Sequence, residues 1–127
     1  MQIERNKNPE FLNDYITHIS VVKGLAKGTV SDYYQDIRQF LRFLKLYRGN
    51  VPNISPAMLP DTDIADLTIE DMRSVTLRDI HSYYSFIATE CGNQDKIRCR
   101  KATSLRSLFR YLTKQARLLD YDPTTNL

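Results

Sequence analysis

The sequence predicts an all-α fold, a compact bundle of four main helices with one long irregular segment between the second and third. Along four stretches, apolar residues recur at alternating steps of three and four, the spacing that places them on one face of a helix. No stretch alternates apolar and polar residues as a half-buried strand does. The length of 127 residues suits a single domain with one core.

The first helix is expected to begin at Asn8-Pro9. Asn8 is a favourable N-cap, and Pro9 suits the first helical position, where its missing N–H would be unpaired in any case. Gly24 and Gly28 interrupt the chain after this helix. Its apolar stripe consists of Phe11, Leu12, Tyr15, Ile16, Ile19 and Val22.

The second helix is expected to run from Thr29, a favourable N-cap, to about Arg48, just before Gly49. Its apolar face, which includes Tyr33 as a core residue, consists of Val30, Tyr33, Ile37, Phe40, Leu41 and Leu44. Polar and basic residues follow the same rhythm on the other side: Lys27, Ser31, Gln35, Arg38, Arg42 and Lys45.

The segment 49–75 is expected to be a long, mobile loop with short helical turns. It contains Pro52, Pro56 and Pro60 among several Asn, Asp and Thr residues, a composition typical of loops. Such a length is unusual in a compact helical domain. One short turn is expected around residues 63–67.

A helical turn and the third helix follow this loop. Thr68 and Asp71 resemble a capping box, which predicts a single helical turn at Ile69–Arg73. Thr76 is a favourable N-cap for the third helix, which is expected to end near Gly92. The inner face of this helix is expected to be Leu77, Ile80, Tyr84, Ile87 and Ala88.

The fourth helix, from Gln94 to Arg117, is the most informative stretch of the chain. One side carries an apolar stripe of Ala102, Leu105, Phe109, Leu112 and Ala116. About half a turn away lie cations and hydroxyls: Lys96, Arg100, Thr103, Ser107, Arg110 and Lys114. Between Asp95 and Arg117 there are eight Lys or Arg residues and one acid. Because nearly all of this charge has one sign, the face is typical of a helix that lies against phosphates rather than of an ordinary solvated face.

Composition narrows the class of protein further. The start of the chain has no apolar stretch of the kind that a signal peptide needs, and no run is long enough to cross a membrane, so a cytoplasmic location is expected. Cys91 and Cys99 lack metal-site spacing, and His18 and His81 are isolated. No metal and no other cofactor is therefore expected.

Charge is distributed unevenly along the chain. Residues 1–48 carry a net charge of +3, residues 49–92 carry −5, and residues 93–127 carry +5. Such an asymmetry favours one orientation on a polyanion, with the acidic part turned away.

Two stretches carry a recognisable pattern. The first is GLAKGTVSDYYQDIRQFLRFL, in which the pattern positions are Thr29, Tyr33, Ile37 and Phe40. The second is RKATSLRSLFRYLTKQARLLDYDPTTNL, in which the pattern positions are Leu105, Arg106, Phe109, Tyr111 and Leu112. Together they resemble the second helix, the last helix and the exit linker of the core-binding domain of the tyrosine recombinases (the phage integrase family), most closely its Xer-type members. In this chain Asp122-Pro123 stands where the family usually has Asn-Pro.

The resemblance implies a SAM-like arrangement of two roughly crossed helical pairs. It also implies an N-terminal arm at 1–8, a core-binding domain at 9–119, and the start of a linker at 120–127. That linker would lead to a C-terminal catalytic domain that this chain lacks. The segment 49–75 is longer than the corresponding connection in Xer-type proteins.

The resemblance implies an activity for a parent protein and none for this chain alone, because neither histidine begins the His-x-x-Arg motif of the catalytic domain. The parent would be a site-specific recombinase or integrase that cleaves and rejoins DNA through a phosphotyrosine intermediate. Its partners would be the double-stranded recombination site and other recombinase protomers, four of them on two sites. The resemblance implies a bacterial, nucleoid-associated protein of the cytoplasm. The first helix is a candidate for contacts between protomers, although core packing explains its apolar residues equally simply.

The resemblance also implies that the second and fourth helices approach the DNA, in agreement with their two basic stripes. The candidates on the second helix are Lys27, Thr29, Ser31, Gln35 and Arg38. The candidates on the fourth helix are Lys96, Arg98, Arg100, Lys101, Thr103, Ser104, Ser107 and Arg110. Gln35 and Arg100 are expected to read base edges. Asp32 stands on a helix that would face DNA, either at the rim of the contact or as an acceptor for a cytosine amine.

One alternative of another class stays open. The chain also fits a helical protein-interaction module that docks an acidic partner. The acidic segment 61–71 suits such an interaction role equally well, with Asp61, Asp63, Asp66, Glu70 and Asp71. A stand-alone enzyme is disfavoured, because no constellation of catalytic residues is recognisable in the sequence.

Overall fold

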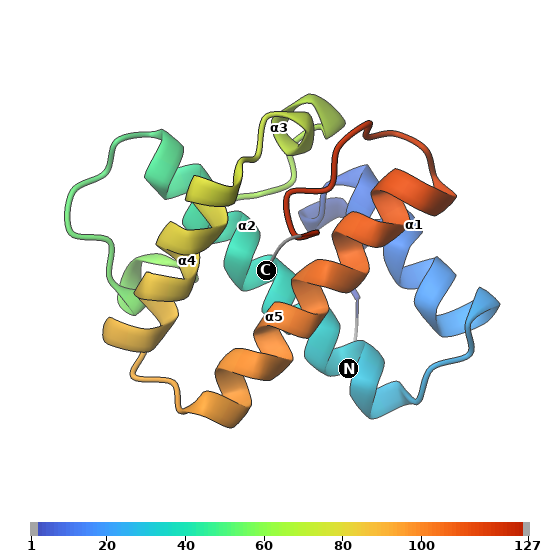
Figure 1. Ribbon diagram of the computed structural model, residues 1–127, viewed down its shortest axis with the longest axis horizontal. Helices are drawn as coiled ribbons and strands as arrows, with labels where there is room; N and C mark the ends of the chain where they lie inside the picture. Colours follow the sequence, from blue (N-terminus) through green and yellow to red (C-terminus); the bar gives the residue numbers. More distant parts are fainter. Residues whose placement is uncertain (1–2, 126–127) are drawn as a thin grey trace.

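The computed structural model describes residues 3–125 and is all-α across that range (Figure 1). Its helices are α1 (Glu10–Thr17), α2 (Lys27–Arg48), α3 (Ile69–Arg73), α4 (Leu77–Thr89) and α5 (Asp95–Arg110). Four of them are the predicted main helices, and α3 is the predicted single turn, so the predicted fold class is confirmed. Residues 1, 2, 126 and 127, which belong to the expected arm and linker, lie outside the described residues.

Short irregular turns complete the helical structure. The segments Arg5–Lys7 and Pro56–Met58 are 3-10 turns, and His18–Val22 and Tyr111–Gln115 are π-helical turns that continue α1 and α5. The fourth helix is therefore shorter than expected, because α5 ends at Arg110 and widens into a π-helical turn. Across residues 3–125, no helix combines the length and the apolar character that a bilayer crossing requires.

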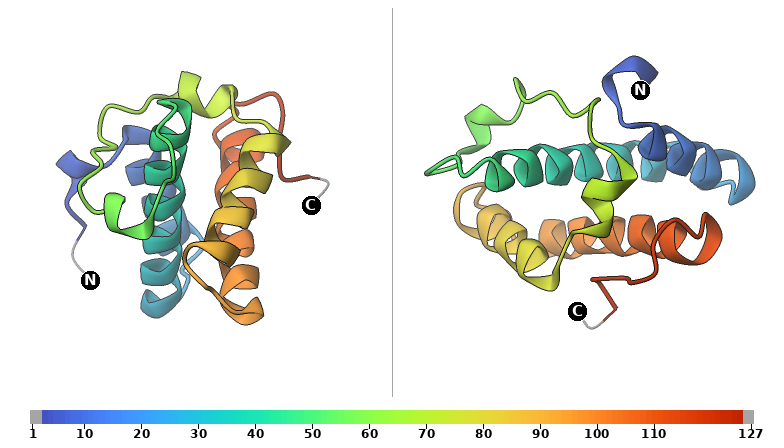
Figure 2. Two further views of the ribbon diagram at one scale, coloured as in Figure 1. Left: turned by 90° about the vertical axis from the view of Figure 1, so that its left-hand side faces the viewer. Right: turned by 90° about the horizontal axis from the view of Figure 1, so that it is seen from above.

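The helices form two layers that cross. Seen from above in Figure 2, α1 and α2 make up one layer, and α4 and α5 make up the other. In Figure 1, α5 passes in front of α2, and the N-terminal ends of both helices lie at the bottom of the view. The core joins the layers through aromatic rings, because the Phe40 ring centroid lies 5.2 Å from that of Tyr83 and 6.3 Å from that of Phe109. This crossing is what places the N-terminal ends of α2 and α5 on one side of the molecule.

The predicted apolar faces are largely buried, but on two helices the buried tyrosine is the neighbour of the one predicted. On α2 the buried tyrosine is Tyr34, whereas Tyr33, which was expected in the core, is half-buried. On α4 Tyr83 is fully buried, whereas Tyr84 is half-buried. Adjacent tyrosines fit the helical period almost equally well, so the choice between them depends on tertiary partners. The Tyr83 hydroxyl finds such a partner in Gln39 Oε1, 2.8 Å away on α2.

The capping predictions differ in outcome. Thr76 caps α4 as predicted, and a capping box at Thr68 begins α3 as predicted. Asn8 does not cap α1, because its buried side-chain oxygen accepts instead from the Tyr34 hydroxyl at 3.2 Å and from Arg38, and α1 begins with Pro9 as the capping residue. Thr29 does not cap α2 either, because the helix begins two residues earlier, at Lys27.

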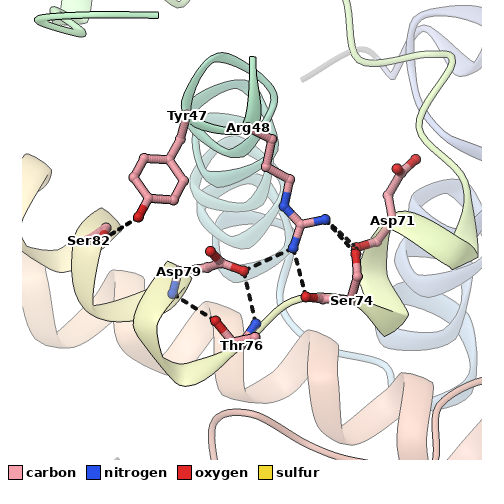
Figure 3. Close-up of polar contacts among 7 residues, drawn as sticks. All are labelled: Tyr47, Arg48, Asp71, Ser74, Thr76, Asp79 and Ser82. Carbon is pink, nitrogen blue, oxygen red and sulfur yellow. Dashed lines mark hydrogen bonds and ion pairs between the residues drawn. The ribbon is translucent and has the colours of Figure 1, made fainter. Parts of the chain in front are cut away.

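The end of α2 is tied to α3 and α4 by Arg48 (Figure 3). Its guanidinium donates to the Ser74 carbonyl at 2.8 Å, to the Asp79 carboxylate at 2.9 Å and to the Asp71 carbonyl at 3.3 Å. The same Asp79 carboxylate accepts from the Thr76 backbone N–H at 2.9 Å, so the cap of α4 and the end of α2 share one acid. A separate hydrogen bond between α4 and α2, from Ser82 to the Tyr47 hydroxyl at 3.2 Å, lies beside this junction.

Both ends of the described chain pack on the bundle. In the expected arm, Arg5 donates to the Thr17 hydroxyl at 3.2 Å, and Asn8 is buried. In the expected linker, Thr124 is buried. Leu118, just before the linker, accepts a hydrogen bond of 2.9 Å at its carbonyl from Arg73 Nε.

Candidate nucleic-acid interface

The N-terminal ends of α2 and α5 form an edge with two exposed lysines, which we call the N-terminal edge. Lys27 and Lys96 lie in the first turns of these helices, and neither has an acidic partner within residues 3–125. Unpaired backbone N–H groups and the helix dipole add positive potential at the same place. Of the other predicted residues on α2, Gln35 is exposed, while Thr29 and Ser31 are half-buried. This edge can hold anions without breaking any internal ion pair.

Behind this edge, Asp36 joins α2 to α5. The Asp36 carboxylate is 3% exposed and accepts from Arg100 Nη2 at 2.7 Å and Arg100 Nε at 3.0 Å. The Ser104 hydroxyl donates to it at 2.8 Å. The hydrogen bond with Asp36 raises the pKa of the Arg100 guanidinium, and the nearby charge of Asp32 acts in the same direction. Arg100, expected to read bases, is therefore already held by two bonds to a buried acid, although 41% of its side chain is exposed.

Two of the predicted contact residues lie in the interior, which corrects their assignment to a DNA-facing surface. Ser104 is fully buried, with its hydroxyl turned to Asp36, and Lys101 is only 7% exposed. The Lys101 ammonium donates to the Asn93 side chain, and burial lowers its pKa. Both residues share the inward strip of α5 with Leu108, one turn from each other, so neither reaches a ligand that lies on the surface.

Three further predicted residues are occupied by internal partners. Arg38 donates to the Asn8 side chain, and its guanidinium lies 5.6 Å from the centre of the Tyr34 ring. Arg98 pairs with Asp95 in the first turn of α5. Ser107 accepts a hydrogen bond of 2.7 Å from the hydroxyl of the buried Tyr15. These side chains hold the scaffold together and have less freedom to meet a ligand.

The last two predicted residues, Thr103 and Arg110, line a groove beside α5, together with one cation that sequence reasoning missed. This cation is Arg106, an exposed residue between them on the helix. The predicted stripe included Thr103 and Arg110 but had Ser107 between them, whereas the exposed residue between them is Arg106, at steps of three and four. The signal was present in the sequence, because Arg106 completes that spacing. The hydrogen bond from the buried Tyr15 to Ser107 shows that Ser107 faces inward.

The geometry leaves no obvious place for a metal. Within residues 3–125, no group of three or more His, Cys, Asp or Glu side chains converges on one point. Cys91 and Cys99 are both free thiols, the first half-buried and the second exposed.

Comparison with known proteins gives one informative relative. No family model matches the chain, and no solved structure gives a significant match. The chain is 36% identical over 125 residues to "Tyrosine recombinase XerC" of Caldanaerobacter subterraneus subsp. tengcongensis, an alignment that covers 98% of this chain and 35% of the relative. The chain thus spans about a third of the length of the curated relative that it matches. Along nearly its whole length, this chain resembles part of a Xer-type tyrosine recombinase, which confirms the resemblance predicted from its motifs.

Proposed function

We propose that this chain is the double-stranded DNA-binding, core-binding domain of a site-specific tyrosine recombinase, and that it holds one side of the recombination site. The observation that carries the proposal is the N-terminal edge, where two helix N-termini with exposed, unpaired lysines project from the same side of the described structure. The similarity to XerC supports DNA as the polyanion.

In this proposal the edge residues differ in their tasks. Lys27 and Lys96 meet phosphates, which bind favourably at helix N-termini and fix the register of the protein on the duplex. Gln35 is exposed and has the geometry to read an adenine edge. Arg100 contacts the DNA through the part of its guanidinium that is exposed and not bonded to Asp36. Weaker or indirect contributions come from Thr29, Ser31, Arg38, Arg98, Thr103, Ser107 and Arg110.

The chemistry of recombination is assigned to a further part of the proposed parent. Strand cleavage through a tyrosine nucleophile needs cations that stabilise the charge developing on the phosphate. We propose that a catalytic domain outside this chain supplies them, that other protomers share the DNA, and that the protein works on DNA in the cytoplasm. The chain itself is proposed to bind and orient the duplex, without a cofactor.

Salt dependence tests this function most directly. Affinity for a mixed-sequence duplex should fall with salt, with a log–log slope on the order of −3 to −6 for about four to six phosphate contacts. The double substitution Lys27→Gln with Lys96→Gln should weaken binding by about ten- to a hundredfold at low salt and make the slope shallower by about 2. Fluorescence anisotropy with labelled duplex measures both quantities.

Arg78→Gln serves as the matched control, because Arg78 is an exposed arginine on α4, away from the N-terminal edge. Its binding should equal that of the unchanged chain. Duplex binding that is independent of salt concentration would contradict the proposal. An equal loss of affinity in the Arg78→Gln control would also contradict it.

The alternative function is that of a helical protein-interaction module that docks an acidic partner, and the structure offers it less support. Within the segment 61–71, Asp66 pairs with Lys45, Glu70 pairs with Arg73, and Asp71 belongs to the cap of α3. Much of the acidic segment is thus used internally. If the basic edge served an acidic protein instead, the chain would bind that class of partner without the counterion-release slope expected for duplex DNA.

A further inference from the structure

A polar pocket of about 530 Å³ lies between α2, the N-terminal arm and the segment 60–64. Figure 2 shows the arm and this segment on the side of α2 that faces away from α5. We call it the arm pocket, and its charged residues are Glu4, Lys7, Arg38, Arg42, Asp61 and Asp63. Its volume falls in the range of about 300–1,000 Å³ that is common for ligand pockets. Neither Lys27 nor any residue of α5 lines it, so it lies apart from the N-terminal edge.

The walls of the arm pocket are fastened to α2. On the side of the segment 60–64, Lys45 donates to the Asp63 carbonyl at 2.7 Å, and Ile64 is fully buried. On the side of the arm, the buried Asn8 donates to the Tyr34 hydroxyl at 3.0 Å. The pocket is therefore formed by the fold itself, as ligand sites usually are.

Arg42 is the cation of this pocket whose guanidinium lacks a partner. Its Nε is buried and has no hydrogen bond within residues 3–125, and no acid of that range lies within ion-pair distance of it. Buried donors in folded proteins nearly always have an acceptor. Burial lowers the pKa of Arg42, and the nearby charge of Arg38 acts in the same direction. A bound oxyanion would supply the missing acceptor and offset the repulsion between the two arginines.

Arg38 provides a second guanidinium one turn earlier on α2. Its hydrogen bonds to Asn8, to the Lys7 carbonyl and to the Tyr34 hydroxyl all come from Nη1. Its Nε and Nη2 atoms have no hydrogen bond within the described part of the chain. Two guanidiniums on adjacent turns present several donors in fixed directions, which suits the oxygens of a phosphate or carboxylate.

The acids of the arm pocket narrow the class of ligand. Glu4 pairs with Lys7 at 2.8 Å, and the Asp63 carboxylate accepts from the Ala65 backbone N–H at 3.0 Å. Asp61 is exposed and forms no ion pair within residues 3–125. The three acids offset the three cations, so the pocket does not favour an anion that has no hydrogen-bond donors. A phosphate monoester with hydroxyl groups brings acceptors for the arginines and donors for Asp61.

We propose that the arm pocket binds a small phosphate monoester that carries hydroxyl groups. Its phosphate lies between Arg38 and Arg42, and one of its hydroxyls donates to Asp61. This site goes beyond the proposed function and does not depend on it. That water alone solvates Arg42 is the simpler explanation, and it predicts no effect of phosphate on this residue.

Inorganic phosphate and glycerol 3-phosphate are the probes that test this site. Each is titrated into the ¹⁵N-labelled chain at constant ionic strength, and nuclear magnetic resonance follows the Arg42 Nε–H signal. This signal should shift with both probes, together with backbone signals of the arm and of residues 60–64. Glycerol 3-phosphate should bind about two- to tenfold more tightly than inorganic phosphate, because its hydroxyl adds one hydrogen bond to Asp61.

Arg42→Gln separates binding from a purely structural role. Affinity for both probes should fall by about tenfold or more, because charge-assisted hydrogen bonds are lost. Without a probe, the melting temperature should stay the same or rise, because the repulsion from Arg38 one turn away is removed. An arginine that only supported the fold would lower the melting temperature when replaced. Arg78→Gln, which replaces an exposed arginine on α4, is the matched control and should leave probe affinity unchanged.

Asp61→Ala tests the hydroxyl contact. Inorganic phosphate should bind this variant slightly more tightly, because an acid near the anion is removed. The advantage of glycerol 3-phosphate over inorganic phosphate should disappear at the same time. An advantage that persists in Asp61→Ala would overturn the contact between the hydroxyl and Asp61.

Two further outcomes would overturn the site as a whole. An Arg42 Nε–H signal that neither probe shifts would show that water alone solvates this arginine. A duplex affinity that falls as much in Arg42→Gln as in the Lys27→Gln with Lys96→Gln variant would assign the arm pocket to the DNA contact instead. Unchanged duplex affinity in Arg42→Gln, together with lost phosphate binding, is the result expected for a separate site.

Discussion

Asp36 is the buried acid that joins α2 to α5. A buried carboxylate is costly unless several donors surround it, and Asp36 receives three hydrogen bonds, two from Arg100 and one from Ser104. Arg100 remains partly in solvent, which moderates the energy of the pair. The same contacts set the direction in which the basic face of α5 points.

Removing this carboxylate should destabilise the fold. Asp36→Ala should lower the free energy of unfolding by about 2–3 kcal/mol, because part of Arg100 would be left without its acceptor and Ser104 would keep only the Arg100 carbonyl. Urea unfolding followed by circular dichroism measures the change. Asp32→Ala, one turn earlier on the exposed side of α2, should stay within about 0.5 kcal/mol of the unchanged chain. Equal effects of the two substitutions would contradict the role given to Asp36.

Tyr15 should make stability depend on pH in the alkaline range. Burial raises the pKa of its hydroxyl from 10.0 to about 12. Between these values the unfolded chain releases a proton that the folded chain retains, so the free energy of unfolding falls as pH rises, by up to about 2–3 kcal/mol. Urea unfolding at stepped pH measures the fall, and Tyr15→Phe should reduce it. A pH profile unaltered by that substitution would show that other groups cause it.

At the scale of single residues, only part of the site could be predicted from the sequence. The accessible lysines Lys27 and Lys96 follow from spacing, because they lie opposite the apolar stripes of their helices. The burial of Lys101 does not follow, since it depends on Asn93 from the preceding loop. Asp36 was missed for the same kind of reason, because its donors lie more than sixty residues away on α5.

Among the elements, the junction of α2, α3 and α4 depends on Arg48. Its guanidinium donates hydrogen bonds to two backbone carbonyls, a serine hydroxyl and the Asp79 carboxylate, which also caps α4 (Figure 3). Lys45 adds a hydrogen bond of 2.7 Å to the Asp63 carbonyl. The long segment 49–75 is thereby attached to α2 at two places, as well as by its buried Leu59 and Ile64.

Arg48→Ala should loosen this junction. We expect a loss of about 1–2 kcal/mol in the free energy of unfolding, because the carbonyls and Asp79 remain partly solvated and regain water. Proteolytic cleavage within residues 49–67 should become several-fold faster, because local opening exposes the loop. Limited proteolysis with mass spectrometry locates the cuts. Arg78→Ala, which removes an arginine that has no such partners in the described structure, should leave the cleavage pattern unchanged, and faster cleavage there would weaken the assignment.

Helix positions could be predicted well, whereas helix ends could be predicted only where local residues decide them. The caps at Thr68 and Thr76 are formed within four residues of sequence, and both were predicted correctly. The start of α1 was misplaced because Asn8 uses its amide for Tyr34, a partner on another helix. The end of α5 was misplaced because the apolar stripe continues through Leu112 even though the chain has already widened into a π-helical turn.

Across the whole molecule, the acidic helix α3 and the basic N-terminal ends of α2 and α5 lie on opposite sides. The acidic middle of the chain includes α3, which lies at the top of Figure 1, opposite the N-terminal ends of α2 and α5. The net charges of the segments could be predicted from the sequence, but their places in space could not, because the crossing of the two layers depends on core packing. In the proposed complex, this arrangement turns α3 away from the DNA.

Two acid-to-amide substitutions measure this polarity and decide the role of Asp32. Glu70→Gln, on α3, removes a remote charge, so duplex affinity should rise by up to about twofold at low salt and lose this gain near 0.15 M, where screening acts over about 8 Å. Asp32 lies close enough to raise the pKa of Arg100, so Asp32→Asn should give a larger gain that survives more salt if Asp32 sits at the rim of the contact. If Asp32 instead accepts from a cytosine amine, its substitution should weaken binding to the preferred sequence and leave random duplex unaffected. Anisotropy titrations across a salt series distinguish these outcomes, and an effect of Glu70→Gln that persists at high salt would refute long-range repulsion as its cause.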